Sequence, residues 1–93
     1  MGRQLPDELT TRQMVAFAKY MQTLSGMSMS DLTFQQTDVL AASYAIEAAG
    51  KAKWLDEPVS VDDLPLSEML DFGMKILALY WQTWQAAKTD PNS

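Results

Sequence analysis

Apolar side chains recur every three or four positions along residues 66–87, a spacing typical of one long α-helix. The apolar positions fall on two neighbouring faces, one with Met69, Gly73, Ile76, Tyr80 and Ala87, the other with Leu70, Leu77, Trp81 and Trp84. Because this arc is too wide for a single contact, the helix needs more than one packing partner. Two acids near its start, Glu68 and Asp71, and Lys88 near its end match the charge preference of the helix dipole.

A shorter amphipathic helix is predicted over residues 11–24. Its stripe of apolar positions consists of Met14, Phe17, Met21 and Leu24, widened by Val15 and Ala18. Thr10 and Gln13 fit a capping box at its start, with Leu9 and Met14 placed for a hydrophobic staple. Gly26, after Ser25, predicts its end, because glycine readily takes the left-handed conformation that closes a helix.

Between these segments, residues 27–32 are predicted to be a connector and residues 34–49 a further helix. Small residues recur at Ala41, Ala45 and Ala49, a spacing of four that lets another helix approach closely. Gly50 is expected to end or kink this helix.

A short turn is expected around residues 61–64, before the long helix. Ser60 and Asp63 resemble a helix start that Pro65 interrupts, and Pro58 breaks any helix before it. The 93 residues are too few for a two-domain enzyme. We therefore expect one all-α domain over residues 1–93, a small bundle of three principal helices with a short turn or helix before the last. Residues 1–9 form an N-terminal arm, 51–64 an acidic loop and 89–93 a frayed tail.

The chain contains no Cys and no His. Disulfides, thiolate nucleophiles, sulfur-ligated zinc and the commonest general base are therefore excluded. No pair of carboxylates lies on an apolar stretch that would separate their pKa values for acid and base catalysis. The four glycines are spaced as helix punctuation and form no phosphate-binding loop. We expect a protein that is not an enzyme and that uses no cofactor and no metal.

Twelve acidic and seven basic residues give a net charge of −5, which would repel a phosphate backbone. Binding to nucleic acid is therefore not expected. No run approaches the ~20 apolar residues of a membrane span, and residues 1–6 are followed by acids instead of a signal-peptide core. We expect a soluble cytoplasmic protein that does not bind membranes.

Residues 76–87 are twelve consecutive residues without a charge, and they include Tyr80, Trp81 and Trp84. In so small a domain, part of this helix is expected to face a partner. Aromatic side chains are enriched in interface hot spots. The candidate surface for a partner or for self-association is Leu77, Tyr80, Trp81 and Trp84. In the alternative interpretation Tyr80 and Trp84 complete the core, and Trp54 and Leu55 cover one face of the helix.

A second candidate surface is acidic. Residues 56–71 hold six acids and no basic residue, and the candidates here are Asp56, Glu57, Asp62 and Asp63. The order of ligands in a calcium loop is missing, so a metal site is not predicted. A solvated face that complements the start of the long helix explains the acids. A mimic of nucleic acid that binds a basic partner is the alternative.

Three segments carry a family resemblance: LTTRQM at residues 9–14, TDVLAASYAI at 37–46 and EPVSVDDL at 57–64. Together with the order of the helices, these patterns resemble the small tail assembly chaperones of long-tailed bacteriophages over most of the chain. The resemblance implies a protein of the host cytoplasm that binds the long helical tape measure protein until the tail tube polymerises around it. It also implies self-association into a homo-oligomer and, in many members, a longer frameshifted form. The density of Trp in the last helix departs from the family pattern.

Two other functions remain open from the residues alone. One is a small acidic helical inhibitor of a basic partner, whose affinity would fall steeply with salt. The other is a structural subunit that assembles through the last helix. An open polymer of such subunits would keep growing with concentration, whereas a closed assembly would stop at a fixed size.

Overall fold

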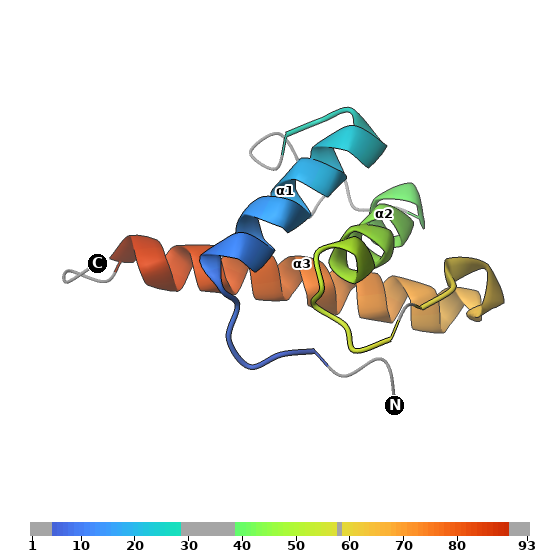
Figure 1. Cartoon of the computed structure of the whole chain (residues 1–93). Coiled ribbons are helices and arrows are strands. Elements are labelled where there is room, and N and C mark those ends of the chain that lie inside the picture. Colours follow the sequence, from blue (N-terminus) through green and yellow to red (C-terminus); the bar gives the residue numbers. More distant parts are fainter. Residues whose placement is uncertain (1–4, 29–38, 58, 90–93) are drawn as a thin grey trace.

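The structure is a computed structural model and describes residues 5–28, 39–57 and 59–89. Its elements are α1 (Thr11–Ser25), α2 (Val39–Lys51), the short 3-10 helix η3 (Val61–Asp63) and α3 (Leu66–Thr89). The described ranges contain no strand, so the predicted all-α fold with three principal helices and a short helix before the last is confirmed. The longest helix, α3, runs across the molecule beside α1 and α2, and its C-terminal end extends past them (Figure 1).

The predicted capping box starts α1. The amide of Gln13 donates to Thr10 Oγ1 at 3.1 Å, and the amide of Thr10 donates to Gln13 Oε1 at 2.9 Å. At the other end Gly26 has a φ of 76°, and its amide donates to the carbonyl of Gln22 at 2.9 Å. Both ends of α1 are therefore fixed by local sequence, and the helix is one residue longer than predicted.

The apolar stripe of α1 is narrower than predicted. Phe17 and Met21 are fully buried, and Met14, Ala18 and Leu24 pack partly against the core. Val15 is 47% exposed, so its assignment to the buried stripe is wrong. The reason is geometric: α1 rests on the rest of the domain along one line of side chains, and Val15 lies on the outer side of that line.

The prediction that Gly50 ends α2 is wrong as well. Helix α2 continues through Gly50 to Lys51, and the reversal occurs at Lys53, which has a φ of 66°. The amide of Lys53 donates to the carbonyl of Gly50 at 3.3 Å, and the amide of Trp54 donates to that of Ala49 at 2.9 Å. These two bonds form a Schellman motif with lysine in the left-handed position that usually holds glycine. The predicted start of this helix at residue 34 lies outside the described residues.

Helices α2 and α3 approach each other closely where Ala42 faces Gly73. A Cβ added to Gly73 would lie 2.6 Å from the Cβ of Ala42, so only glycine fits there. Of the predicted small-residue ridge, Ala45 and Ala49 are fully buried and Ala41 is partly buried. Small residues on both helices thus set the helix spacing, and the contact involves the turn of Ala42 in addition to the predicted ridge.

Trp54, in the segment after α2, closes the core. Its ring stacks on Phe17 with 4.4 Å between ring centroids, and its Nε1–H donates to the carbonyl of Gln13 at 3.0 Å. The side-chain amide of Gln13 in turn donates to the carbonyl of Lys53 at 3.1 Å. The segment predicted as a loop over residues 51–64 therefore begins inside α2, contributes to the core and contains η3.

The predicted frayed tail begins too early, because α3 includes Thr89; residues 90–93 lie outside the described part. Residues 1–4 of the predicted arm and residues 29–32 of the predicted connector also lie outside the described part. Within the described ranges, no helix combines the length and apolarity that crossing a membrane requires.

Candidate protein-binding surface

The structure separates the four residues predicted to bind a partner. Leu77 and Tyr80 are buried in the core, Trp81 is partly buried and Trp84 is 40% exposed. Tyr80 lies 5.4 Å from Phe17 between ring centroids, and burial raises the pKa of its phenol. Of the predicted surface, Trp81 and Trp84 are therefore the side chains that reach solvent in this fold.

Aromatic rings lead along α3 from the core to the surface. Tyr80 and Trp81 meet edge to face at 5.3 Å, and Trp81 and Trp84 meet edge to face at 6.1 Å. The ammonium group of Lys88 lies 4.6 Å from the centre of the Trp84 ring, within cation–π distance. Each ring thus supports the next, and Trp84 is held on a helix whose inner turns are fixed by the core.

The exposed end of α3 is long and weakly charged. Residues 82–88 are exposed except for the partly buried Thr83, and Lys88 is the one charged residue among them. This end projects beyond α1 and α2 (Figure 1). We call residues 81–88 the projecting end of α3. Its surface suits packing against an apolar helical partner, because little charge would have to be desolvated.

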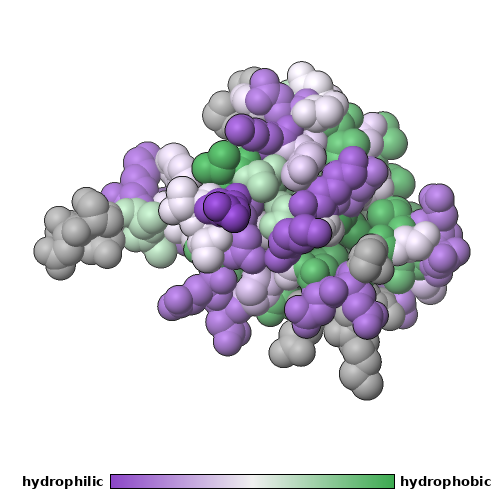
Figure 2. Space-filling view, viewed as in Figure 1, coloured by the Kyte–Doolittle hydropathy of each residue, from purple (hydrophilic) through white to green (hydrophobic). Residues whose placement is uncertain are grey.

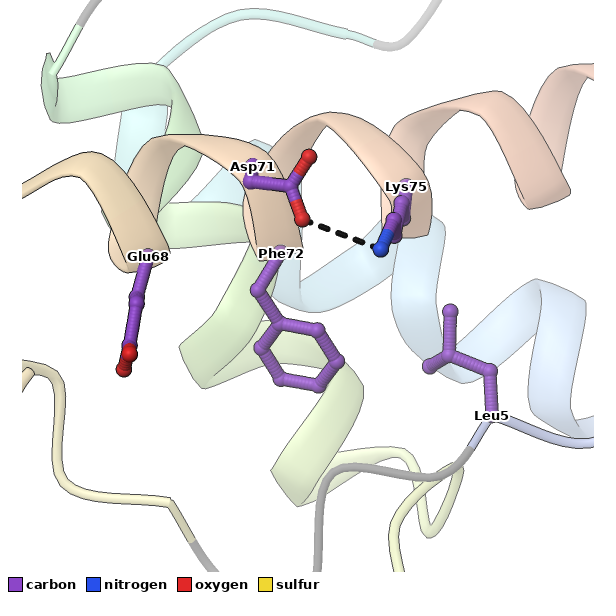
Figure 3. A pocket seen from close by; sticks show the side chains of 5 residues that line it. All are labelled: Leu5, Glu68, Asp71, Phe72 and Lys75. Carbon is purple, nitrogen blue, oxygen red and sulfur yellow. Dashed lines mark ion pairs between the residues drawn. The ribbon is translucent and has the colours of Figure 1, made fainter.

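The N-terminal arm covers a further side of α3. Leu5 and Phe72 line an open pocket of about 530 Å³, and Figure 3 shows both side chains together with Asp71 and Lys75, which also line it. Asp71 and Lys75 form an exposed ion pair at 3.0 Å. Further along, Leu9 lines a pocket of about 390 Å³ together with Leu79. The arm therefore takes up part of the wide apolar arc that the sequence assigns to this helix.

The four acidic candidates, Asp56, Glu57, Asp62 and Asp63, are all exposed. Asp62 and Asp63 form part of η3, directly before α3, where negative charge favours the start of the helix. In the residues that the structure describes, no group of three or more potential ligand side chains is placed to hold a metal ion.

Apolar side chains that the sequence interpretation did not single out are also exposed. They lie at the starts of two helices, with Val39 and Leu40 on α2 and Leu66 on α3. In Figure 2 hydrophobic side chains are most abundant on the side of the molecule where α2 and the start of α3 lie. The signal in the sequence is weak, because apolar residues in a first turn fit a buried stripe equally well.

No protein-family model, no curated protein and no solved structure matches this chain. The function is therefore inferred from the surface of the molecule and from the residues themselves.

Proposed function

We propose that the chain is a non-enzymatic, protein-binding helical domain that acts as a tail assembly chaperone of a long-tailed bacteriophage. In this role it holds the tape measure protein soluble in the host cytoplasm until the tail tube forms around it. The observation that carries the proposal is the projecting end of α3, where Trp84 is 40% exposed on a helix anchored in the core.

The chemistry of this surface fits a helical client. Trp81 and Trp84 offer large apolar area on side chains with few rotatable bonds, so that ordering them costs little entropy. The neighbouring exposed residues Gln82 and Gln85 are uncharged. An amphipathic helix that lies along this end can bury its apolar face without leaving a charge unpaired.

The net charge supports the same role. A chain with a charge of −5 keeps a complex with an aggregation-prone client in solution through mutual repulsion between complexes. Two of the three segments that carry the family resemblance coincide with local structural features. Residues 9–14 include the capping box that starts α1, and residues 57–64 include η3. The resemblance thus falls on features that shape the fold.

The experiment is capture of partners from the native source, read by mass spectrometry, with wild-type protein and a Trp84→Ser variant. Recovery of one long helical protein by the wild type and its loss with Trp84→Ser is the expected result. Leu40→Ser is the matched control, because Leu40 is 59% exposed on a different helix, α2. Equal recovery of a basic nuclease or DNA-binding protein by all three would contradict the proposal and favour an acidic inhibitor.

A further inference from the structure

Charge is segregated within this protein. Helix α1 holds two cations, Arg12 and Lys19, and no acid, although the whole chain has a net charge of −5. Residues 56–71 hold six acids and no base. A basic surface on an otherwise acidic molecule is suited to contact an acidic surface.

The outer side of α1 is both basic and apolar. An open pocket of about 660 Å³ runs along it, larger than the pockets beside Leu5 and Leu9. The residues that line it are Thr11, Arg12, Val15, Ala16, Lys19, Tyr20 and Thr23. Val15 and Tyr20 are 47% and 37% exposed. We call Arg12, Val15, Lys19 and Tyr20 the α1 face.

Two cations of the α1 face are available to pair with carboxylates of a binding partner. Neither Arg12 nor Lys19 forms an ion pair with any residue that the structure describes. The ammonium group of a third cation, Lys51, lies 5.7 Å from the centre of the Tyr20 ring. It also forms an ion pair with Glu47, at 3.8 Å. An apolar strip bordered in this way fits an occupant that carries apolar side chains flanked by carboxylates.

The chain itself carries such a surface at the start of α3. Asp62 and Asp63 are exposed in η3, and Leu66 is 58% exposed one turn later. We call these three residues the acidic start. It offers carboxylates to Arg12 and Lys19 and an apolar side chain to Val15 and Tyr20.

The α1 face and the acidic start of one molecule cannot contact each other. Helices α1 and η3 each pack against α2, and in Figure 1 they lie on different sides of the domain. We propose that the α1 face of one copy binds the acidic start of a second copy, in a head-to-tail contact. Because the two surfaces differ, the contact is heterologous and leaves one surface of each kind free at the ends of a pair. This inference does not depend on the proposed function.

The contact is expected to be weak and sensitive to salt. Each surface is about one helix face, smaller than the ~800 Å² per partner of a standard stable interface. We expect self-association between about 10 μM and 1 mM. Raising the salt from 50 to 500 mM should weaken it by about tenfold, because exposed charges supply much of the attraction.

Sedimentation equilibrium of the full chain at rising concentration tests the proposal. The average mass of the wild type should rise above the 10.4 kDa of one chain. Two charge-reversed variants, Arg12→Glu with Lys19→Glu and Asp62→Lys with Asp63→Lys, should each remain at one chain mass when alone. An equimolar mixture of the two should associate again, because each then offers a surface of opposite charge to the other.

Matched controls change the same amount of charge elsewhere. Lys53→Glu with Lys75→Glu and Asp7→Lys with Glu8→Lys should both associate at least nine-tenths as well as the wild type. Circular dichroism establishes that every variant is folded. A wild type that stays at one chain mass up to 1 mM overturns the proposal. Association that survives both reversals, or a mixture that does not recover it, also overturns it and places any contact elsewhere.

Discussion

Replacing Gly73 with alanine perturbs a close contact between α2 and α3. The added Cβ would lie 2.6 Å from the Cβ of Ala42, 2.7 Å from its Cα and 2.8 Å from its carbonyl oxygen. Real Cβ contacts of this kind do not fall below about 3.0 Å, and none of these three atoms can rotate away. The two helices must therefore separate, and the loss of packing costs about 1–3 kcal/mol, near the upper end because three atoms clash.

Part of this loss is offset by helix propensity. Alanine in a helix interior is favoured over glycine by about 1 kcal/mol. The net effect of Gly73→Ala is a destabilisation of about 1–2 kcal/mol, which for a domain of this size lowers Tm by about 5–15 °C. Thermal and urea unfolding followed by circular dichroism measure both quantities.

Gly50→Ala is the matched control. Gly50 also lies inside a helix, but nothing lies within 4 Å of a Cβ built there. Its substitution should gain the propensity term alone and stabilise the protein by about 0.5–1 kcal/mol. Opposite signs for the two glycines are the expected result. If Gly73→Ala were as stabilising as Gly50→Ala, the close approach of α2 and α3 described here would be refuted.

Four further predictions follow from single contacts. Thr10→Ala removes the cap of α1 and should lower the free energy of unfolding by about 1 kcal/mol in urea titrations, with no loss counting against the capping box. Lys53→Gly relieves the left-handed backbone at φ 66° and should raise the free energy of unfolding by up to about 1 kcal/mol, whereas a lowered free energy of unfolding would contradict that geometry. Trp54→Phe keeps an aromatic ring on Phe17 but loses the hydrogen bond to Gln13, for an expected cost of about 1–2 kcal/mol; a neutral result would exclude that bond as a contributor. The raised pKa of Tyr80 means that the unfolded chain releases this proton first, so stability is retained below pH 10.0 and declines above it, and a Tyr80→Phe variant should decline less steeply.

Local sequence determined the parts of the fold that could be predicted. The capping box at Thr10 and the stop at Gly26 are both read from neighbouring residues, and both are present. The end of α2 could not be read in the same way. Lysine is disfavoured in the left-handed conformation. The reversal at Lys53 is compensated by the packing of Trp54 on Phe17, a residue that is distant in the sequence.

The candidate site was partly predictable for a related reason. The charge-free run over residues 76–87 correctly predicts that α3 has an apolar arc too wide for a single packing contact. Sequence periodicity cannot show which neighbour each face of the helix contacts. Tyr80 is buried beside Phe17, and Leu77 belongs to the same core cluster, which Phe17 and Trp54 join from elsewhere in the chain. The outward position of Val15, and with it the α1 face, likewise depends on which line of α1 touches the domain.

Photo-cross-linking from position 84 tests whether the projecting end of α3 binds a protein client. A photoreactive amino acid is placed at position 84 in one variant and at the exposed position 56 in another, and cross-linked products from the native source are identified by mass spectrometry. We expect a cross-link from position 84 to one long helical protein, with at most a trace from position 56. Cross-linking to a partner from position 56 alone would contradict it and assign binding to the acidic surface.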